Sequence, residues 1–226
     1  MEGDIRTIIE TSDGSHTILS DRFQVSYHSK YGAIQESNHV FLANGLHPVA
    51  IKQHHISILE MGFGTGLNAL LSFREAWLNH WTVVYHAVEA YPISLEQAQQ
   101  LNYHEWLNDL DDPALLVHFH QQDWDTDVTY NDIFTLKKIA SKFESLQLPK
   151  ESYDLVYYDA FAPSAQPELW EANVLKIMYE ALKQGGMLVT YCAKGSVKRT
   201  LKSLGFLIEE LPGPPGKREM TRAIKP

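Results

Sequence analysis

The chain has 226 residues, of which 44% are hydrophobic and 21% are charged, and these values are typical of one compact domain with room for a small appendage. No run approaches the ~20 apolar residues of a membrane-spanning helix, the first residues do not resemble a secretory leader, and a single cysteine excludes an internal disulfide. The net charge of −9 argues against a generally basic nucleic-acid-binding protein, so we expect a cytoplasmic protein with an acidic body.

Strand-like and helix-like runs alternate along most of the chain. We expect an N-terminal β extension or lid over residues 1–50, in which Thr7–Ile9 and the alternating Asn38–Leu42 form a hairpin. Residues 51–226 are expected to form an α/β domain of the Rossmann-like kind. Its sheet would be mostly parallel and doubly wound, with an antiparallel C-terminal strand.

In the second part, each element is predicted from the period of its apolar residues. The predicted strands are Ile56–Glu60, Val83–Glu89, Leu115–Phe119, Tyr153–Tyr158 and Met187–Tyr191. The predicted helices are Leu67–Leu78, a segment opened by Pro92, Ile133–Leu146, Glu168–Leu182 and Ser196–Leu204. The last residues, Phe206–Leu211 and Arg218–Lys225, are predicted to form two strands joined by a stiff turn rich in proline and glycine.

A glycine cluster stands where the first predicted strand meets the first helix. Gly62, Gly64 and Gly66 fall at alternate positions, whereas a dinucleotide fingerprint has the spacing G-x-G-x-x-G. Glycines there let the backbone approach a ligand, and a helix N-terminus offers unpaired amides. The preceding carboxylate, Glu60, would repel a pyrophosphate and favours a ligand with an ammonium, such as the methionyl part of S-adenosylmethionine.

Acidic residues also follow the next two predicted strands. Glu89 ends the second strand, where doubly wound folds place an acid against ribose hydroxyls. Asp123 follows the third, where it could accept from an adenine amine while Trp124 or Phe63 packs on the ring. Each acid alone could equally be a capping or surface residue. Their joint placement with the glycine loop favours S-adenosylmethionine over a dinucleotide.

The fourth predicted strand leads to Asp159, which would then face the methyl group of such a cofactor. Alkylamines have a pKa of ~10 and are mostly protonated at neutral pH. Asp159 could accept a proton from an amine or orient its N–H, while Phe161, Tyr158 and Trp170 stack on a heterocycle and exclude water. The alternative is that Asp159 caps a loop and the aromatic residues belong to the core.

Four segments together resemble a known family. They are Tyr31–Phe41, Glu60–Asn68, Asp159–Pro163 with the Pro-Glu-Leu-Trp that follows, and Gly213–Met220. This order is similar to the methyltransferase half of the bifunctional tRNA modification enzyme MnmC and to its stand-alone relatives. The resemblance spans about residues 25–221, and its aspartate loop and Gly-Pro-Pro-Gly-Lys-Arg-Glu-Met segment are specific to that family.

The resemblance implies methylation of the aminomethyl group of 5-aminomethyl-2-thiouridine at the tRNA wobble position, with S-adenosylmethionine as cofactor. The implied cofactor-binding residues are Glu60, Gly62, Phe63, Gly64, Gly66, Asn68, Glu89, Asp123, Trp124 and Asp159, and the implied catalytic residues are Asp159 and Phe161. The implied substrate-binding residues are Tyr31, Phe161, Pro163, Trp170, Lys194, Lys217 and Arg218. Since no flavin-dependent domain is visible, a separate enzyme would supply the aminomethyl precursor.

The charge distribution is consistent with that partner. The segment from Lys183 to the C-terminus carries a net charge of +6, and the rest of the chain carries −15. Lysine and arginine side chains in this segment, among them Lys194, Lys217 and Arg218, could contact phosphates of the anticodon arm. An ordinary solvated surface is the alternative interpretation.

Two other functions remain open from the sequence. A methyltransferase of the same fold could act on a small-molecule amine, for which an acidic body needs no explanation, and a non-catalytic RNA-binding module could keep the fold. A metal enzyme is not expected, because His54, His55, His118 and His120 lack the spacing and neighbouring acids of a zinc site.

Overall fold

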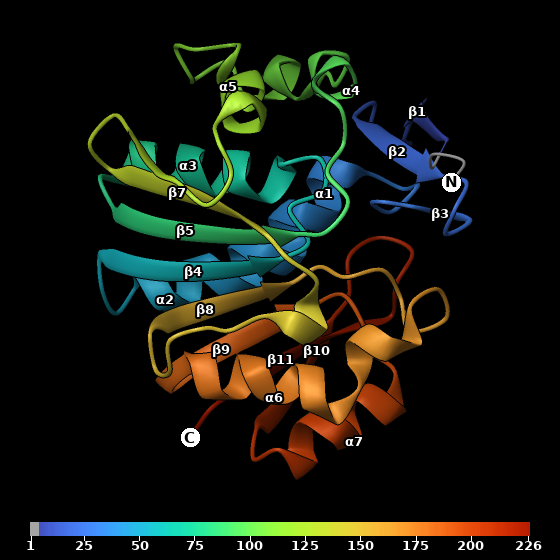
Figure 1. Cartoon of the computed structure of the whole chain (residues 1–226), viewed down its shortest axis with the longest axis vertical. Coiled ribbons are helices and arrows are strands. Elements are labelled where there is room, and N and C mark those ends of the chain that lie inside the picture. Colours follow the sequence, from blue (N-terminus) through green and yellow to red (C-terminus); the bar gives the residue numbers. More distant parts are fainter. Residues whose placement is uncertain (1–4) are drawn as a thin grey trace.

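The computed structural model describes residues 5–226. At its centre lies an eight-stranded sheet in the order β10-β11-β9-β8-β4-β5-β7-β6 (Figure 1). The strands are β4 (His55–Met61), β5 (Thr82–Glu89), β6 (Asp127–Tyr130), β7 (Phe134–Ala140), β8 (Tyr153–Tyr158), β9 (Leu182–Thr190), β10 (Leu207–Pro212) and β11 (Glu219–Ile224). Neighbours from β9 to β7 are parallel, whereas β6 and β11 run antiparallel to the strands beside them. The parallel strands therefore end at one edge of the sheet, where open α/β folds bind ligands.

Helices cover both faces of the sheet. They are α1 (Ala33–Ser37), η1 (Asn38–Leu46), α2 (His47–Ala50), α3 (Leu67–Asn79), α4 (Leu95–Gln99), η2 (Tyr103–Trp106), α5 (Leu115–Gln121), η3 (Phe143–Ser145), η4 (Pro167–Trp170), α6 (Ala172–Ala181) and α7 (Gly195–Ser203). The elements α1, η1, α2, α3 and α5 share a hydrophobic cluster with one face, and η3, η4, α6 and α7 share another with the opposite face. Within residues 5–226, no helix is long and apolar enough to cross a bilayer.

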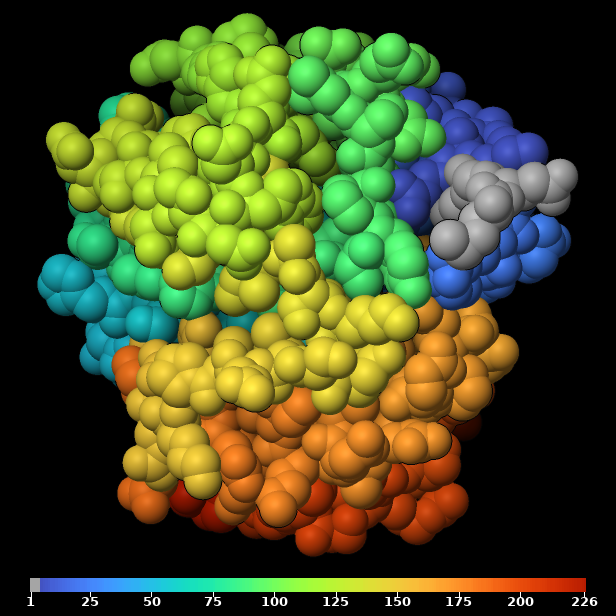
Figure 2. All heavy atoms as spheres, in the orientation of Figure 1, coloured from blue at the N-terminus to red at the C-terminus, as the bar shows by residue number. Residues whose placement is uncertain are grey.

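A second, three-stranded antiparallel sheet lies beyond the carboxyl ends of the parallel strands (Figure 1). It consists of β1 (Arg6–Glu10), β2 (His16–Ser20) and β3 (Val25–Ser26). The Arg6 guanidinium anchors it by donating hydrogen bonds to the carbonyls of Tyr91 and Pro92 at 2.7 and 2.8 Å. In Figure 2 the blue N-terminal atoms meet the green segment that follows β5 and the yellow-to-orange segments that follow β7 and β8.

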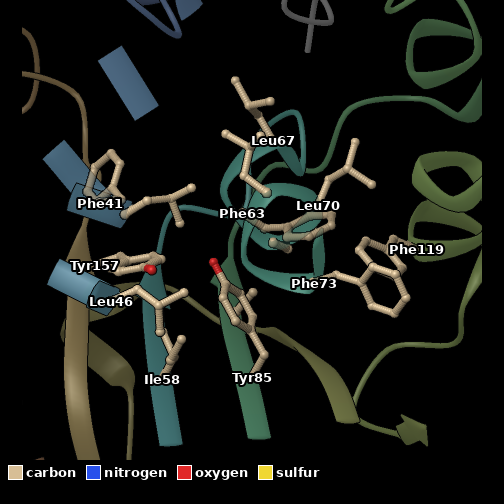
Figure 3. Close-up of a cluster of buried hydrophobic side chains, with 14 of the residues drawn as sticks. Phe41, Leu46, Ile58, Phe63, Leu67, Leu70, Phe73, Tyr85, Phe119 and Tyr157 are labelled. Atoms are coloured by element: carbon tan, nitrogen blue, oxygen red, sulfur yellow. The ribbon is translucent and has the colours of Figure 1, made fainter. Parts of the chain in front are cut away.

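The larger hydrophobic cluster explains how α3 is positioned. Leu67, Leu70 and Phe73 occur at helical spacing on α3 and are buried. Figure 3 shows them in one cluster with Ile58 of β4 and Tyr85 of β5. Because α3 packs on these two strands, its N-terminus is fixed next to the point where β4 ends.

The predicted fold class is confirmed. The strands predicted after residue 51 at Ile56–Glu60, Val83–Glu89, Tyr153–Tyr158 and Met187–Tyr191 correspond to β4, β5, β8 and β9. The two late strands are β10 and β11, and β11 is the antiparallel strand inserted beside β9. The helix predicted over Glu168–Leu182 is shorter than expected, because α6 begins at Ala172 after a 3₁₀ turn.

The predictions were wrong for the segment between residues 115 and 146. Leu115–Phe119 belongs to the helix α5, and Ile133–Leu146 contains the strand β7 rather than a helix. Alternate residues of β7 are buried, and the third of them is Lys138, whose Nζ donates to the carbonyl of His120 at 2.7 Å. A lysine at an inward position hid the period of two that marks a strand.

The Asn38–Leu42 segment was also predicted wrongly, because it lies in the helical η1 and not in a hairpin. Three consecutive apolar residues, Val40, Phe41 and Leu42, are all buried, which alternation along a strand does not produce. At Gly45 the segment comes so close to the sheet that a Cβ atom would meet Val189 at 3.0 Å. Only Thr7–Ile9 of the expected hairpin is a strand, in β1.

Candidate active site

A cavity opens at the carboxyl ends of β4, β5 and β8. Its lining comes from the glycine loop, the segments after β5, β7 and β8, and the N-terminal sheet. Among the lining residues are Phe23, Tyr27, His28, Gly62, Phe63, Gly64, Thr65, Asn68, Glu89, Tyr91, Lys142, Phe143, Glu144, Asp159, Phe161 and Gln166. Pieces of chain that are distant in sequence thus form one site, at the place that the sheet topology favours.

The glycine loop is held against neighbouring backbone. The amides of Gly62 and Phe63 both donate to the carbonyl of Val88, at 3.0 and 3.1 Å. Gly62 has a φ of +102°, and a Cβ atom there would lie 3.0 Å from the backbone oxygen of Asp159. Gly64 has a φ of +52°, and its Cβ would meet the Tyr27 ring at 3.0 Å. Both positions therefore require glycine, for space and for backbone conformation.

Glu89 ties this loop to the end of β5. Its Oε2 accepts the Gly64 amide at 3.0 Å, and its Oε1 accepts the Tyr91 amide at 2.8 Å. Each carboxylate oxygen can accept a further hydrogen bond. Since Glu89 also lines the cavity, it can accept from hydroxyl donors of a ligand.

Asn68, in the first turns of α3, connects two carboxyl groups. Its Nδ2 donates to Oε1 of Glu60 at 3.0 Å and to Oδ2 of Asp159 at 2.9 Å. Burial raises the pKa of Glu60 well above its usual range, and the charge of Asp159 adds to this. Glu60 does not line the cavity. Its contact with the site is the hydrogen bond that it accepts from Asn68.

One buried acceptor atom of a cavity-lining residue, Oδ1 of Asn68, has no hydrogen-bond partner within residues 5–226. Buried acceptors normally have donors. Together with the glycine cradle and the acids Glu89 and Asp159, this atom suits a ligand that carries N–H donors, hydroxyls and positive charge. The residues present therefore fit S-adenosylmethionine.

Asp159 lines the cavity at the end of β8, and its backbone amide donates to the Met61 carbonyl at 3.1 Å. The pKa of Asp159 is raised to about 7, chiefly by burial and also by the carboxylate of Glu36, against the opposing effects of the Asn68 hydrogen bond and Lys217. Oδ1 makes no hydrogen bond to another residue of the described chain. A carboxyl group of this kind can exchange a proton near neutral pH.

Aromatic side chains line the cavity that contains Asp159. The Phe161 ring lies 5.0 Å from the ring of Phe23, which lies between β2 and β3, and 5.1 Å from that of Tyr27, which follows β3. Trp170 is buried, and its Nε1 donates to the Phe161 carbonyl at 2.8 Å. Trp170 thus supports the loop that carries Phe161 and does not line the cavity.

Asp123 and Trp124 do not line the cavity either. The argument for them was wrong, because the residues before them form α5 and the third parallel strand is β7. Trp124 instead packs beside Lys138, whose Nζ lies 4.7 Å from the Trp124 ring centroid. The residues that do follow the third parallel strand into the cavity are Lys142, Phe143 and Glu144.

The predicted substrate-binding residues are in different environments. Arg218 has a side chain that is 95% exposed, and Lys194 is exposed. Lys217, by contrast, forms an ion pair with Glu36, with Nζ 2.5 Å from Oε1. Tyr31 is 58% exposed and lies against the backbone of Gly216, and Pro163 is half-buried outside the cavity.

Sequence reasoning missed several lining residues. Phe23, Tyr27 and His28 reach the cavity only because the small sheet folds over it, and no local pattern announces that contact. The sequence did hold a signal for the Lys142–Glu144 segment. Asn131 and Asp132 stand between two runs of β-branched or aromatic residues, which favours a hairpin turn, and both have positive φ in the turn between β6 and β7. A hairpin at this place makes Phe134–Ala140 a strand, and Lys142–Glu144 then follows the end of that strand.

Within residues 5–226, no cluster of three or more His, Cys, Asp or Glu side chains could hold a metal ion.

Comparisons with known proteins identify the family of the chain. A family described as S-adenosyl-L-methionine-dependent methyltransferase matches residues 93–226. The tRNA 5-methylaminomethyl-2-thiouridine biosynthesis bifunctional protein MnmC of Cupriavidus metallidurans is 32% identical over 228 residues, which cover 95% of this chain and 33% of that protein. The protein of the same name from Magnetococcus marinus is 33% identical over 223 residues, covering 92% and 32%.

A solved structure is similar in fold. The crystal structure of MNMC2 from Aquifex aeolicus matches with a TM-score of 0.80 at 23% identity, over 100% of this chain and 71% of that one. The chain spans about one third of the length of the bifunctional relatives that it matches. The family match includes Asp159 and the loop after β7, while the glycine loop precedes it.

Proposed function

The chain belongs to the S-adenosyl-L-methionine-dependent methyltransferases, and we propose that it methylates the primary amine of 5-aminomethyl-2-thiouridine at the wobble position of tRNA. The relatives that are about one-third identical are named for biosynthesis of the corresponding methylaminomethyl nucleoside. The observation that carries the proposal is Asp159, a carboxyl group that lines the cavity and has a pKa of about 7. Such a group suits an acceptor that must lose a proton before it reacts.

The glycine loop and Glu89 are proposed to hold the cofactor, which supplies an electrophilic methyl group on a sulfonium. Gly62 and Gly64 leave space for the ligand, and Glu89 accepts hydrogen bonds from its ribose hydroxyls. Asn68 lines the same cavity and keeps Asp159 in position through its Nδ2. Phe63 and Phe143 supply apolar walls.

Asp159 is proposed to take the proton that the acceptor must lose. An alkylammonium with a pKa of ~10 has no lone pair for attack. Transfer of one N–H proton to Oδ1 of Asp159 would free that lone pair. The cofactor, held by the glycine loop and Glu89, would supply the electrophilic methyl group that the lone pair needs.

The aromatic rings are proposed to stack on the nucleobase and to keep water away. Phe161 is the best placed of them, since it contacts Phe23 and Tyr27 across the cavity. The β1–β3 sheet would then act as the cover of the site. Residues 33–50, in contrast, pack in the main hydrophobic cluster, so we assign the covering role to residues 6–28.

The tRNA partner is proposed to lie on the face that carries Lys194 and Arg218. Both side chains are exposed and can reach phosphates of an anticodon arm, while the exposed Tyr31 offers a ring for a neighbouring base. The reaction proposed is methylation alone, and a separate enzyme would supply the aminomethyl group. The tRNA substrate places this reaction in the cytoplasm.

Transfer of labelled methyl from S-adenosylmethionine to tRNA isolated from cells that lack this activity tests the proposal. Nucleoside analysis should find the label in 5-methylaminomethyl-2-thiouridine. A Phe161→Leu variant should bind cofactor normally and transfer more slowly. If the wild-type protein binds cofactor but labels only small amines and no tRNA, the tRNA assignment is wrong and a small-molecule methyltransferase is the correct description.

A further inference from the structure

A further cavity adjoins the one that contains Asp159. It measures about 370 Å³, which is in the usual range of ligand sites, ~300–1,000 Å³. Tyr27, His28 and Phe161 line both this cavity and the one that contains Asp159. The remaining lining includes Glu36, Lys217 and Tyr191. We call this space the Glu36 cavity.

Glu36 is a buried carboxylate whose one ion-pair partner among residues 5–226 is Lys217. Its side chain is 7% exposed, Oε2 accepts the Ser29 amide at 2.7 Å, and Oε1 pairs with Nζ of Lys217 at 2.5 Å. The Lys217 side chain is 32% exposed, so solvent and solutes can reach it. Burying an unpaired carboxylate is costly, so a cation beside Glu36 stabilises it.

Lys217 has an aromatic neighbour as well as an acidic one. In the position that pairs with Glu36, its Nζ lies 3.7 Å from the centroid of the Tyr191 ring, within the range of a cation–π contact. A displacement of the partly exposed Lys217 side chain would open Oε1 of Glu36 to another cation. A ligand with its own ammonium group could then take the position beside Glu36 without leaving the carboxylate unpaired.

We propose that the Glu36 cavity receives the methyl-accepting group, a heteroaromatic ring with a primary ammonium substituent, and that Lys217 occupies the position of this ammonium until the acceptor arrives. The inference rests on the proposed amine methylation and adds a specificity-determining residue to it. Phe161, Tyr27 and Tyr191 supply aromatic faces for the ring. Exchange of one ammonium for another keeps Glu36 paired while the acceptor binds.

The electrostatics of Asp159 support this placement. Glu36 raises the pKa of Asp159 and Lys217 lowers it, so both charges act on the proposed base. An ammonium that replaces Lys217 beside Glu36 would therefore also act on the charge of Asp159. Neutral or anionic substituents on the same ring would not replace Lys217, so the cavity selects cationic acceptors.

Two variants test the inference, with Glu209→Gln as the matched control. Glu209 pairs with Arg222 at 2.6 Å on β10 and lines neither cavity. With aminomethyl-bearing tRNA as acceptor, Glu36→Gln should raise KM at least ~10-fold, the loss expected when a charged hydrogen-bond partner is removed. Its affinity for S-adenosylmethionine, measured by calorimetry, should equal that of the wild type and of Glu209→Gln.

Lys217→Met should act in the opposite direction and lower KM for the acceptor, because the competing ammonium is gone. The pH profile of kcat/KM separates a direct effect of Glu36 and Lys217 on the reaction from a merely structural role of these residues. The charged groups acting on Asp159 are Glu36 from α1 and Lys217 from the β10–β11 turn, with the buried Glu60 on β4 nearby. The acidic limb of the profile should move to lower pH in Glu36→Gln and to higher pH in Lys217→Met.

An unchanged KM in Glu36→Gln, or an equal loss of acceptor and cofactor binding, overturns the inference while the proposed function stands. If melting curves show that Glu36→Gln does not fold, Lys217→Met decides, and an unchanged or raised KM rejects the inference. Absence of methyl transfer to the tRNA by the wild-type protein rejects the proposed function and this inference together.

Discussion

Two groups of charges in the molecule have very different surroundings. One is the floor of the cavity, formed by Glu60, Asn68 and Asp159, and the other is the basic face, which carries Lys194 and Arg218. At the floor, Asn68 connects Glu60 and Asp159, burial dominates, and the pKa of Asp159 reaches about 7. On the basic face, Lys194 and Arg218 lie in solvent, where salt screens their fields. A single charge can therefore control chemistry at the floor, whereas cations on the basic face act only in sum.

The largest effect should come from Gly62→Val. The substituted Cβ would meet the backbone oxygen of Asp159, and the φ of +102° disfavours any side chain, so cofactor binding should be lost. Gly185→Val is the matched control, because Gly185 has a φ of +74° but open space around its Cβ position. Calorimetry with S-adenosylmethionine should show binding only in the control. Binding by Gly62→Val would contradict the cradle.

Asp159→Asn should be nearly as severe on turnover but not on binding. Loss of a positioned proton acceptor lowers kcat by ~10²- to 10⁴-fold, while the amide keeps the shape of the cavity. Cofactor affinity should stay near the wild-type value. If kcat and cofactor affinity fell together, Asp159 would belong to cofactor binding instead.

The pKa of about 7 for Asp159 also predicts a pH dependence of activity and stability. Below that pH the carboxyl group is protonated, so kcat/KM should fall roughly tenfold per unit, and Asp159→Asn should lack this limb. Because the pKa in the folded state lies above the ordinary 3.8, the folded protein binds the proton more tightly. This contribution to stability is complete below pH 4 and is lost as pH rises through 7, which urea unfolding at a series of pH values would measure.

Charge reversal on the basic face should have a smaller and salt-dependent effect. Lys194→Glu with Arg218→Glu should raise KM for tRNA roughly 10-fold at low salt and reduce its salt dependence, with kcat unchanged. Lys176→Glu on α6 is the control, since Lys176 is also exposed and near an acid, Glu180. An equal effect of the control would move the RNA-binding face elsewhere.

The smallest effect is expected for Asp123→Asn. The sequence favoured this residue for the adenine amine, but Asp123 does not line the cavity. Cofactor affinity should therefore equal that of the wild type, and calorimetry provides the measurement. A clear loss of affinity would restore the original interpretation of Asp123.

The sequence predictions succeeded where a local pattern determines the structure and failed where the structure depends on contacts between distant parts of the chain. β4, the glycine loop and β8 were predictable because each has its pattern within about ten consecutive residues. The β6–β7 hairpin was missed because Lys138 is buried at an inward position where an apolar residue is expected. Nothing local predicts that Phe23 and Tyr27 cover the cavity.

Charge alone was similarly insufficient for Lys217. Its sequence neighbour Arg218 is almost fully exposed, yet Lys217 faces Glu36 from the other end of the chain. Sequence reasoning therefore gave both residues the same phosphate-binding role. Which of two adjacent cations is partly buried depends on the turn between β10 and β11, and hence on the fold.

The contact between Glu36 and Lys217 spans 181 residues of sequence, and His39 meets Pro212 across 173. At synthesis rates of roughly 5–20 residues per second, these partners leave the ribosome on the order of ten to forty seconds apart. A nascent chain stopped before residue 217 already contains the glycine loop and Asp159 but lacks one wall of the Glu36 cavity. In the proposed scheme, competence to recognise the acceptor is acquired only with the β10–β11 turn, after the glycine loop and Asp159 have been synthesised.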